Sequence, residues 1–467
     1  MADPTRTDAP AQFGSLFRSL VLDPALLLDR VLSAEAVALA VAEEAGQTCQ
    51  RIFTPLVTLA VFLGQVLADD RSCRAAVTRL LAWRAARGMR PCSPDTGAYC
   101  KARLRMSEAL LPRLVRQTGD ALQAGAADAW LSGGRRVVIV DGSTVSMPDT
   151  PENQAAFPQH KNQKPGCGFP IARVVVLLSL ATGGVLDAAL GSSKGKLSGE
   201  HALLRSLHGR LRPGDILLAD AYYSSFDEVV TLVGMDVDVV MRQVANRKTD
   251  FRRGTRLGRE DHLVTWHRHR NRAEWMTREA FAELPRQLRM RELRVRVGKR
   301  GFRTRSLVVV TSLLDPEAFP GRELAALYRR RWAAELDIRS IKQAMGTDVL
   351  RCLSPSMIRK EFFAHLLAYN LIRGMMAEAA RRHGVSPREL SLQGARQTLE
   401  AFRGELAHGP GAGGEGLVAA ALEAIAYHRV GGRPDRVEPR VVKRRPKAYP
   451  RMQVPRRLAR KRLMRAG

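Results

Sequence analysis

The chain has 467 residues, enough for about two to four domains, and with 45% apolar and 26% charged residues its composition is typical of a globular protein. Lys and Arg outnumber Asp and Glu by 75 to 46, and the net charge of +29 indicates a polyanionic partner, with nucleic acid favoured over an anionic membrane surface. The sequence has no apolar stretch long enough to span a membrane, no signal-peptide pattern and no paired cysteines, which predicts a cytoplasmic protein without a zinc site. Binding to DNA would associate it with the nucleoid.

Residues 1–130 have the pattern of a compact helical domain. Apolar residues recur at helical spacing in the stretches 56–67, 75–85 and 110–122, and arginines and lysines are interspersed among them. Such a basic helical surface can neutralise phosphates and present side chains to base edges. We therefore predict that residues 1–130 form an N-terminal helical domain that binds DNA.

Residues 131–246 have a different pattern, in which short apolar runs alternate with helical segments. Strands are predicted at 135–141, 171–180, 184–190, 215–220 and 237–242, and helices at 199–211 and 225–233. The first and fourth of these strands end on a carboxylate, Asp141 and Asp220. The alternation predicts the first part of an α/β domain.

The α/β pattern is interrupted at residues 247–305, which are rich in arginine and in short alternating runs and are predicted to form a β-rich insertion. Residues 306–380 resume the pattern as the second part of the same domain. Within them a strand is predicted at 306–313, one helix at 322–345 and another from 358 to 381. Residues 381–467 are predicted to form a C-terminal helical region and a basic, disordered tail.

Asp141 and Asp220 are candidate site residues because each closes a buried apolar strand. A carboxylate at the end of a strand, where the chain enters a loop, lies where α/β sheets place functional groups. The alternative for each aspartate is a helix cap or a turn residue, which is the commoner role of an isolated aspartate. Taken singly, neither residue decides between the two roles.

A third carboxylate, Glu335, lies on the helix predicted at 322–345. With about 100° per residue, Tyr328, Arg331, Glu335 and Lys342 fall within about 60° of one another, at the edge of an aliphatic face. This placement would hold Glu335 at a cleft lined by the two aspartates. The alternative is an exposed helix with weak ion pairs between residues four apart.

Three carboxylates in so basic a chain suit phosphodiester chemistry. Cleavage of a phosphodiester needs an activated water and a stabilised leaving oxygen, and two divalent ions held by carboxylates supply both. Mg²⁺ prefers such hard oxygen ligands, with Mn²⁺ as a substitute. Arg331 and Lys342 do not ligate metals, but they can position phosphates.

The spacing Tyr328-x2-Arg331-x3-Glu335-x6-Lys342 resembles the Y-R-E-K signature of the IS4 family of bacterial insertion-sequence transposases, which are DDE enzymes related to the Tn5 transposase. The segments DGSTVSMPDTPEN and LLADAYYSS resemble the two aspartate regions of that family, and the resemblance extends over residues 30–380. Ala221 follows the second aspartate where the family frequently has glycine or arginine.

The resemblance implies an RNase H-like core, a mixed five-stranded sheet with helices, in which Asp141, Asp220 and Glu335 bind the metal ions. It further implies cut-and-paste transposition by a homodimer that pairs the terminal inverted repeats and joins them to target DNA, often through a hairpin. Tyr328, Arg331 and Lys342 would contact phosphates. A tryptophan of the insertion, Trp266 or Trp275, would stack on a flipped base, or be an ordinary core or surface residue.

Three other functions stay open at this point. A stand-alone nuclease of the same fold would cut DNA without joining it. A decayed or domesticated copy would bind DNA without cutting it. A membrane-surface protein would use the basic tail on lipid headgroups, although the carboxylate pattern does not explain such a role.

Overall fold

The computed structural model describes residue 16 and residues 31–44, 51–195, 198–296, 306–407, 414–430 and 452–465. The chain divides into two compact units, and each of them draws on separate parts of the sequence. The first unit contains residues 1–131, 181–188 and 336–430, and the second contains residues 132–180, 189–335 and 431–467. Two elements, β3 (Val185–Ser192) and α12 (Trp332–Arg339), begin in one unit and end in the other.

The first unit is helical around one long central helix, α13. Its elements are α2 (Ala34–Glu44), α3 (Pro55–Leu67), α4 (Cys73–Ala85), α5 (Gly97–Arg105), α6 (Leu110–Ala124), η2 (Asp128–Trp130), η5 (Ser340–Ala344), α13 (Pro355–Arg382), η6 (Pro387–Glu389), α14 (Leu392–Ala407) and α15 (Gly414–Tyr427). Nearly every residue of α13 is buried, polar ones included, which makes this helix the core of the unit. The sequence prediction of helices before residue 130 is confirmed for the described residues.

Local sequence explains where these helices begin and how closely they pack. The Thr54 side chain caps α3, with Pro55 at its first turn, and Ser72 caps α4. Asn370 of α13 accepts a hydrogen bond from the Val185 backbone N–H at 2.7 Å, and its side-chain amide donates to the Val185 carbonyl at 2.9 Å. A side chain of α13 thus replaces a sheet partner for the start of β3.

The second unit is built on a mixed sheet with the strand order β3-β2-β1-β4-β5-β9-β8-β7-β6. Its further elements are β1 (Val137–Ser146), α7 (Pro151–Ala156), β2 (Ile171–Ser179), α8 (Glu200–Ser206), η3 (His208–Arg210), β4 (Ile216–Ala219), η4 (Ala221–Tyr223), α9 (Phe226–Gly234), β5 (Asp238–Arg242), β6 (Thr255–Gly258), β7 (Asp261–His267), α10 (Arg278–Glu283), β8 (Gln287–Arg296), β9 (Ser306–Thr311), α11 (Gly321–Arg329) and α16 (Arg456–Arg465). β1 is antiparallel to β2 and parallel to β4, which is parallel to β5. β3, β2, β1, β4 and β5 are consecutive in the strand order and make up the mixed five-stranded sheet that the sequence predicts.

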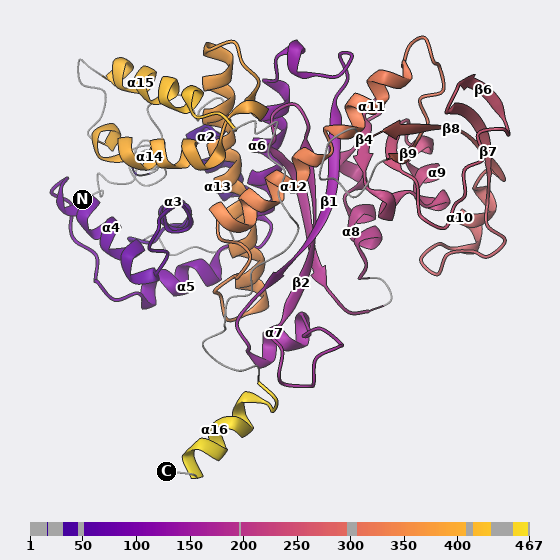
Figure 1. The fold of residues 1–467 in the computed structure, drawn as a ribbon. Helices are drawn as coiled ribbons and strands as arrows, with labels where there is room; N and C mark the ends of the chain where they lie inside the picture. The colour runs from indigo at the N-terminus through magenta and orange to yellow at the C-terminus, as the bar shows by residue number, and fades with distance from the viewer. Residues whose placement is uncertain are drawn as a thin grey trace. The chain divides into compact units, whose positions relative to one another are not determined.

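The β-rich insertion continues this sheet instead of forming a sheet of its own. β9 pairs with β5, and β8, β7 and β6 follow outward in antiparallel order, as Figure 1 shows. The buried polar residue Arg291 of β8 forms an ion pair with Asp261 of β7, with Nε to Oδ1 at 2.8 Å. This ion pair joins two strands of the insertion, and the ladders from β8 to β9 and from β9 to β5 attach the insertion to the core.

Besides the end of β1, which is described with the site below, three predicted elements differ from the structure. The helix predicted at 199–211 is two short ones, α8 and η3, and the helix predicted at 322–345 is three pieces, α11, α12 and the π-helical turn η5. The tail predicted to be disordered contains α16, because Pro455 is followed by Arg, Leu, Ala and Lys, which all favour helix. Residues 431–451, the first part of that tail, lie outside the described residues. None of the described helices has the length and apolar character that a membrane crossing requires.

Candidate active site

Asp141 and Asp220 are placed side by side by the register of two parallel strands. β1 and β4 pair with Val137 opposite Ile216, and each aspartate lies four residues further along its own segment. The carboxyl ends of adjacent parallel strands meet at one edge of a sheet, where α/β proteins place functional groups. The register therefore brings together the first two carboxylates of the predicted triad.

The two aspartates have different local settings. β1 does not end at Asp141, as the sequence predicted, but continues to Ser146, because β2 stays paired with it over that length. What changes at Asp141 is burial, since the four residues before it are buried and Asp141 is half-buried. β4 does end at Ala219, and Asp220 then caps η4 by accepting the Tyr222 N–H at 2.8 Å.

Glu335 and Arg331 form the helical side of the site. Glu335 lies in the first turn of α12, and its Oε1 accepts a hydrogen bond from Nη2 of Arg331 at 3.1 Å. The Glu335 side chain is 38% exposed, so solvent and a substrate have access to it. This ion pair was the alternative explanation for the helix pattern, and here it joins a residue of the predicted triad to one of the predicted phosphate contacts.

The pKa of Asp141 shows that these groups share one electrostatic environment. Burial is the main cause that raises the pKa of Asp141 to about 6. The Gly142 N–H and the Arg331 guanidinium oppose this rise, and the negative charges of Asp220 and Glu335 contribute to it. Asp141 Oδ1 accepts that Gly142 N–H at 2.9 Å. Three carboxylates and one guanidinium therefore influence each other at this edge of the sheet.

The helix that carries Glu335 is broken just before it. Between residues 330 and 334 the backbone hydrogen bonds join residues three apart, for example from the Arg331 N–H to the Tyr328 carbonyl at 3.0 Å. Such a tightened turn has about three residues per turn, so the constant step of about 100° used in the sequence analysis does not hold there. The prediction of one continuous helical face was wrong, although Arg331 and Glu335 still meet.

Tyr328 and Lys342 lie on different segments from Glu335. Tyr328 is buried in the last turn of α11, where burial raises the pKa of its hydroxyl and neighbouring Arg331 lowers it. Lys342 belongs to the π-helical turn η5, within the first compact unit. The structure thus groups Tyr328, Arg331, Glu335 and the two aspartates in the second unit.

A fourth carboxylate, Glu200, escaped the sequence analysis. It lies in the first turn of α8, and its carboxyl group covers Gly142 so closely that a Cβ there would lie 2.5 Å from Glu200 Cδ. The Tyr223 hydroxyl donates a hydrogen bond to Glu200 Oε2 at 3.3 Å. The only signal in the sequence was an acidic residue after Gly199 at a helix start, which is too common to be selective.

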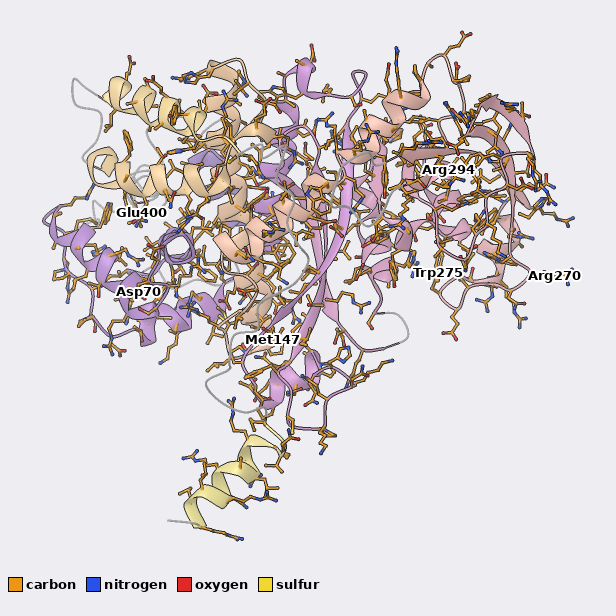
Figure 2. The ribbon with its side chains drawn as sticks, in the orientation of Figure 1. Asp70, Met147, Arg270, Trp275, Arg294 and Glu400 are labelled. Atoms are coloured by element: carbon orange, nitrogen blue, oxygen red, sulfur yellow. The ribbon has the colours of Figure 1, made fainter. Side chains whose placement is uncertain are left out.

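The two tryptophans of the insertion have different environments. Trp266 of β7 is 3% exposed, its indole N–H donates to Glu292 Oε1 at 3.0 Å, and the Arg247 guanidinium lies 3.5 Å from its ring centroid. Trp275, labelled in Figure 2, is half-buried in the segment between β7 and α10, with the Arg205 guanidinium 3.9 Å from its ring centroid. Burial argues against Trp266 as a stacking residue and leaves Trp275 as the candidate.

Comparison with known proteins gives the family. Residues 132–371, more than half of the chain, match the family model described as the transposase DDE domain. The chain belongs to the DDE transposases. It is also 28% identical to the transposase InsG for insertion sequence element IS4 of Escherichia coli (strain K12), over 360 residues that cover 76% of this chain and 77% of that protein. The resemblance to IS4 transposases predicted from the sequence is confirmed.

Among solved structures, this transposase is similar to the piggyBac transposase in its synaptic complex with hairpin DNA, determined by cryo-electron microscopy. The TM-score is 0.42 at 9% sequence identity, and the likeness covers 87% of this chain and 83% of that chain.

DDE transposases act on DNA with divalent metal ions. Among the described residues, no three His, Cys, Asp or Glu side chains converge closely enough to hold one ion. The donor chemistry of the site nevertheless fits a divalent cation, because Asp141, Asp220 and Glu335 offer hard oxygen ligands. Burial is the main cause of the raised pKa of Asp141, and the charges of Asp220 and Glu335 add to it; a bound cation would offset both effects.

Proposed function

We propose that this transposase mobilises an insertion sequence of the IS4 type, with Asp141, Asp220 and Glu335 as its catalytic carboxylates. It would bind the terminal inverted repeats as a homodimer, cut the DNA at their ends, in some steps through a hairpin, and join them to target DNA at the nucleoid. The observation that carries the proposal is the register of β1 and β4, which sets Asp141 beside Asp220, in charge contact with Glu335 and Arg331.

The three carboxylates would hold Mg²⁺, with Mn²⁺ as a substitute. Bound there, the ions would activate the attacking water or hydroxyl and stabilise the leaving oxygen. Arg331 would hold Glu335 in place through its hydrogen bond and present its remaining donors to a phosphate. Tyr328 would orient Arg331, and Lys342 would bind a phosphate near the transferred end.

The N-terminal helices are proposed as the DNA-reading part. Some of their cations serve the fold: Arg103 is buried and donates to Cys73 Sγ at 3.1 Å, and Arg79 donates to the Asp70 carbonyl at 2.6 Å. Among the described residues of this region, the exposed cations remain for phosphates; they are Arg51, Arg74, Arg87, Arg90, Lys101 and Arg105. DNA affinity should therefore fall steeply with salt.

The decisive experiment replaces each carboxylate by its amide. Glu335→Gln, Asp141→Asn and Asp220→Asn should each abolish cleavage of end-containing DNA with Mg²⁺ while end binding stays within a few-fold. The amides keep shape but lose the negative charge that holds the cation. Glu152→Gln, at an exposed position of α7, is the control and should cut like the unchanged protein.

Cleavage retained in any one of the three variants would contradict the assignment of the triad. A strand-transfer assay with pre-cleaved ends separates a transposase of this kind from a nuclease, because a nuclease would cut without joining. Protein that never nicks such DNA with Mg²⁺ or Mn²⁺ would be a copy that only binds.

A further inference from the structure

An exposed aromatic ring lies directly beside the candidate active site. Tyr222 is 48% exposed, whereas the other two described tyrosines of the second unit, Tyr223 and Tyr328, are buried. The Tyr222 backbone N–H donates to Asp220 Oδ1, so its position is tied to one of the proposed metal ligands. The exposed part of this ring offers an aromatic face to a ligand beside the carboxylates.

The ring of Tyr222 is supported from behind by other rings. The centroid of the His201 imidazole lies 4.7 Å from that of the Tyr222 ring, with an interplanar angle of 30°. The Tyr223 ring contacts the Tyr222 ring edge-on, with a centroid distance of 5.6 Å and an interplanar angle of 86°. Gly199 lies beneath the hydroxyl, and a Cβ there would be 3.6 Å from Tyr222 Oη. Tyr222 and His201 together form what we call the aromatic platform.

A buried carboxylate fixes the lower ring of the platform. Glu228 Oε2 lies 3.4 Å from His201 Nδ1, and Glu228 Oε1 lies 2.7 Å from His208 Nε2. Burial alone would raise the pKa of Glu228, but the hydrogen bonds from His201 and His208 outweigh it and bring that pKa down to about 2. The ionised Glu228 thus prevents the imidazole from turning, and the platform is preorganised.

The same glutamate also reaches the tryptophan of the insertion. Arg205 Nη1 lies 3.5 Å from Glu228 Oε2, and its guanidinium stacks on the Trp275 ring. Glu228 therefore connects two aromatic side chains that come from different segments of the second unit. The Arg205 guanidinium covers part of the Trp275 ring, which is half-buried, whereas the Tyr222 ring is exposed.

We propose that Tyr222 stacks on a nucleobase of the DNA strand adjacent to the scissile phosphate. The proposal rests on the proposed function, because that function brings a DNA strand to the carboxylate next to this ring. Every base offers a π-face, and stacking on an aromatic side chain is favourable without depending strongly on sequence. The platform would thus hold the end of the strand while Asp141, Asp220 and Glu335 act on its phosphate.

The test uses the full-length protein and end-containing DNA with 2-aminopurine at successive positions around the cleavage site. Binding is measured without divalent ions, so that no strand is cut during the measurement. In the unchanged protein, the 2-aminopurine at one position should be quenched by stacking. Tyr222→Ala should restore its fluorescence and weaken end binding by about fivefold to a hundredfold, whereas Tyr222→Phe and Tyr222→Trp should keep both the quenching and the affinity.

The matched control is Tyr427→Ala, which removes another exposed tyrosine, 83% exposed on α15, and should change neither signal. Circular dichroism melting checks that each variant is folded. Glu228→Gln should loosen the platform and restore part of the fluorescence, although it leaves the Tyr222 ring in place.

Two results would overturn the proposal. One is quenching and affinity that survive Tyr222→Ala in folded protein; the other is loss of both in Tyr222→Phe, which would assign the effect to the hydroxyl group. Failure of the proposed function would look different, because the amide variants of the triad would then cut DNA like the unchanged protein.

Discussion

The strand side and the helix side of the candidate active site are held by different interactions. Asp141 and Asp220 lie on β1 and β4, whose register is fixed by a ladder of main-chain hydrogen bonds. Glu335 lies on α12, which is preceded by a tightened turn and followed by a π-helical turn. The backbone of α12 alone therefore does not fix the direction of this short helix. The helix side needs a side-chain anchor that the strand side does not.

Asp337 is the anchor that the structure offers for α12. It is almost fully buried and forms ion pairs with Arg373 of α13 and with Arg388 of η6. The Tyr369 hydroxyl donates to its Oδ1 at 3.3 Å. Two residues after Glu335, one carboxylate thus pairs with a buried guanidinium, that of Arg373, and a part-buried one, that of Arg388. A single side chain holds α12, whereas many main-chain hydrogen bonds hold the paired strands.

The largest expected effect tests this anchor. Asp337→Asn should lower the free energy of unfolding by about 3–5 kcal/mol, because it removes the negative charge that faces the buried Arg373 guanidinium and the part-buried Arg388 guanidinium. It should also reduce DNA cleavage at least tenfold at a temperature where the protein is folded. Urea unfolding measures the first effect and end cleavage the second. Glu389→Gln, which breaks an exposed ion pair with Arg429, is the control and should cost less than about 1 kcal/mol.

The second prediction concerns the strand side. Arg136 and Asp215, just before β1 and β4, form a buried bidentate ion pair at 2.7 and 2.5 Å. Asp215→Asn should lower the free energy of unfolding by about 2–3 kcal/mol, since one charged hydrogen-bonded pair is lost. The ladder between β1 and β4 stays, so cleavage by the folded variant should remain within about threefold of the unchanged protein. A loss of cleavage as large as that of Asp337→Asn would contradict the contrast between the two sides.

These two sides also differ in how far the sequence predicts them. The proximity of Asp141 and Asp220 follows from two apolar runs that end on carboxylates, once the two runs pair as parallel strands. The order of the strands in the sheet was not predicted. The turn at residues 330–334 has no such signal. It lies within three consecutive arginines and a tryptophan, residues that all tolerate helix, so local propensity does not predict it.

The sequence also did not predict which side chains that are distant along the chain would contact each other. Glu200 reaches Gly142, and Asp337 reaches Arg373 and Arg388, only after the chain has folded. Trp266 shows the same limit, because its partner Glu292 lies on the neighbouring strand and turns a candidate stacking residue into a buried one. Periodicity identifies the elements, but it does not tell which polar groups satisfy each other.

The third prediction separates two roles of Arg331. Arg331→Ala should reduce cleavage on the order of 10²-fold, as expected for a cation that stabilises phosphate charge in the reaction. It should also tighten the binding of Mn²⁺ to the DNA-free protein, because a positive charge beside Asp141 and Glu335 is removed. Calorimetric titration with Mn²⁺ gives the affinity. Weaker Mn²⁺ binding would mean instead that Arg331 mainly positions Glu335. In that case Arg331→Lys, which keeps the charge but not the geometry of the guanidinium, would restore little of the lost Mn²⁺ affinity.

The smallest expected effect is that of the Tyr328 hydroxyl. Tyr328 is buried at the end of α11, next to the turn that leads to Arg331, and its hydroxyl and the guanidinium influence each other. Tyr328→Phe keeps the ring in its packing and removes one hydrogen-bonding group, which is worth about 0.5–1.5 kcal/mol. Cleavage should therefore fall by about threefold to tenfold, with the unfolding free energy changed by no more than that amount. If Tyr328→Phe cut DNA as poorly as Arg331→Ala, the hydroxyl would contact the phosphate directly. If it cut DNA normally, the ring alone would hold the turn. The position of α12 would then depend on Asp337 even more than its contacts indicate.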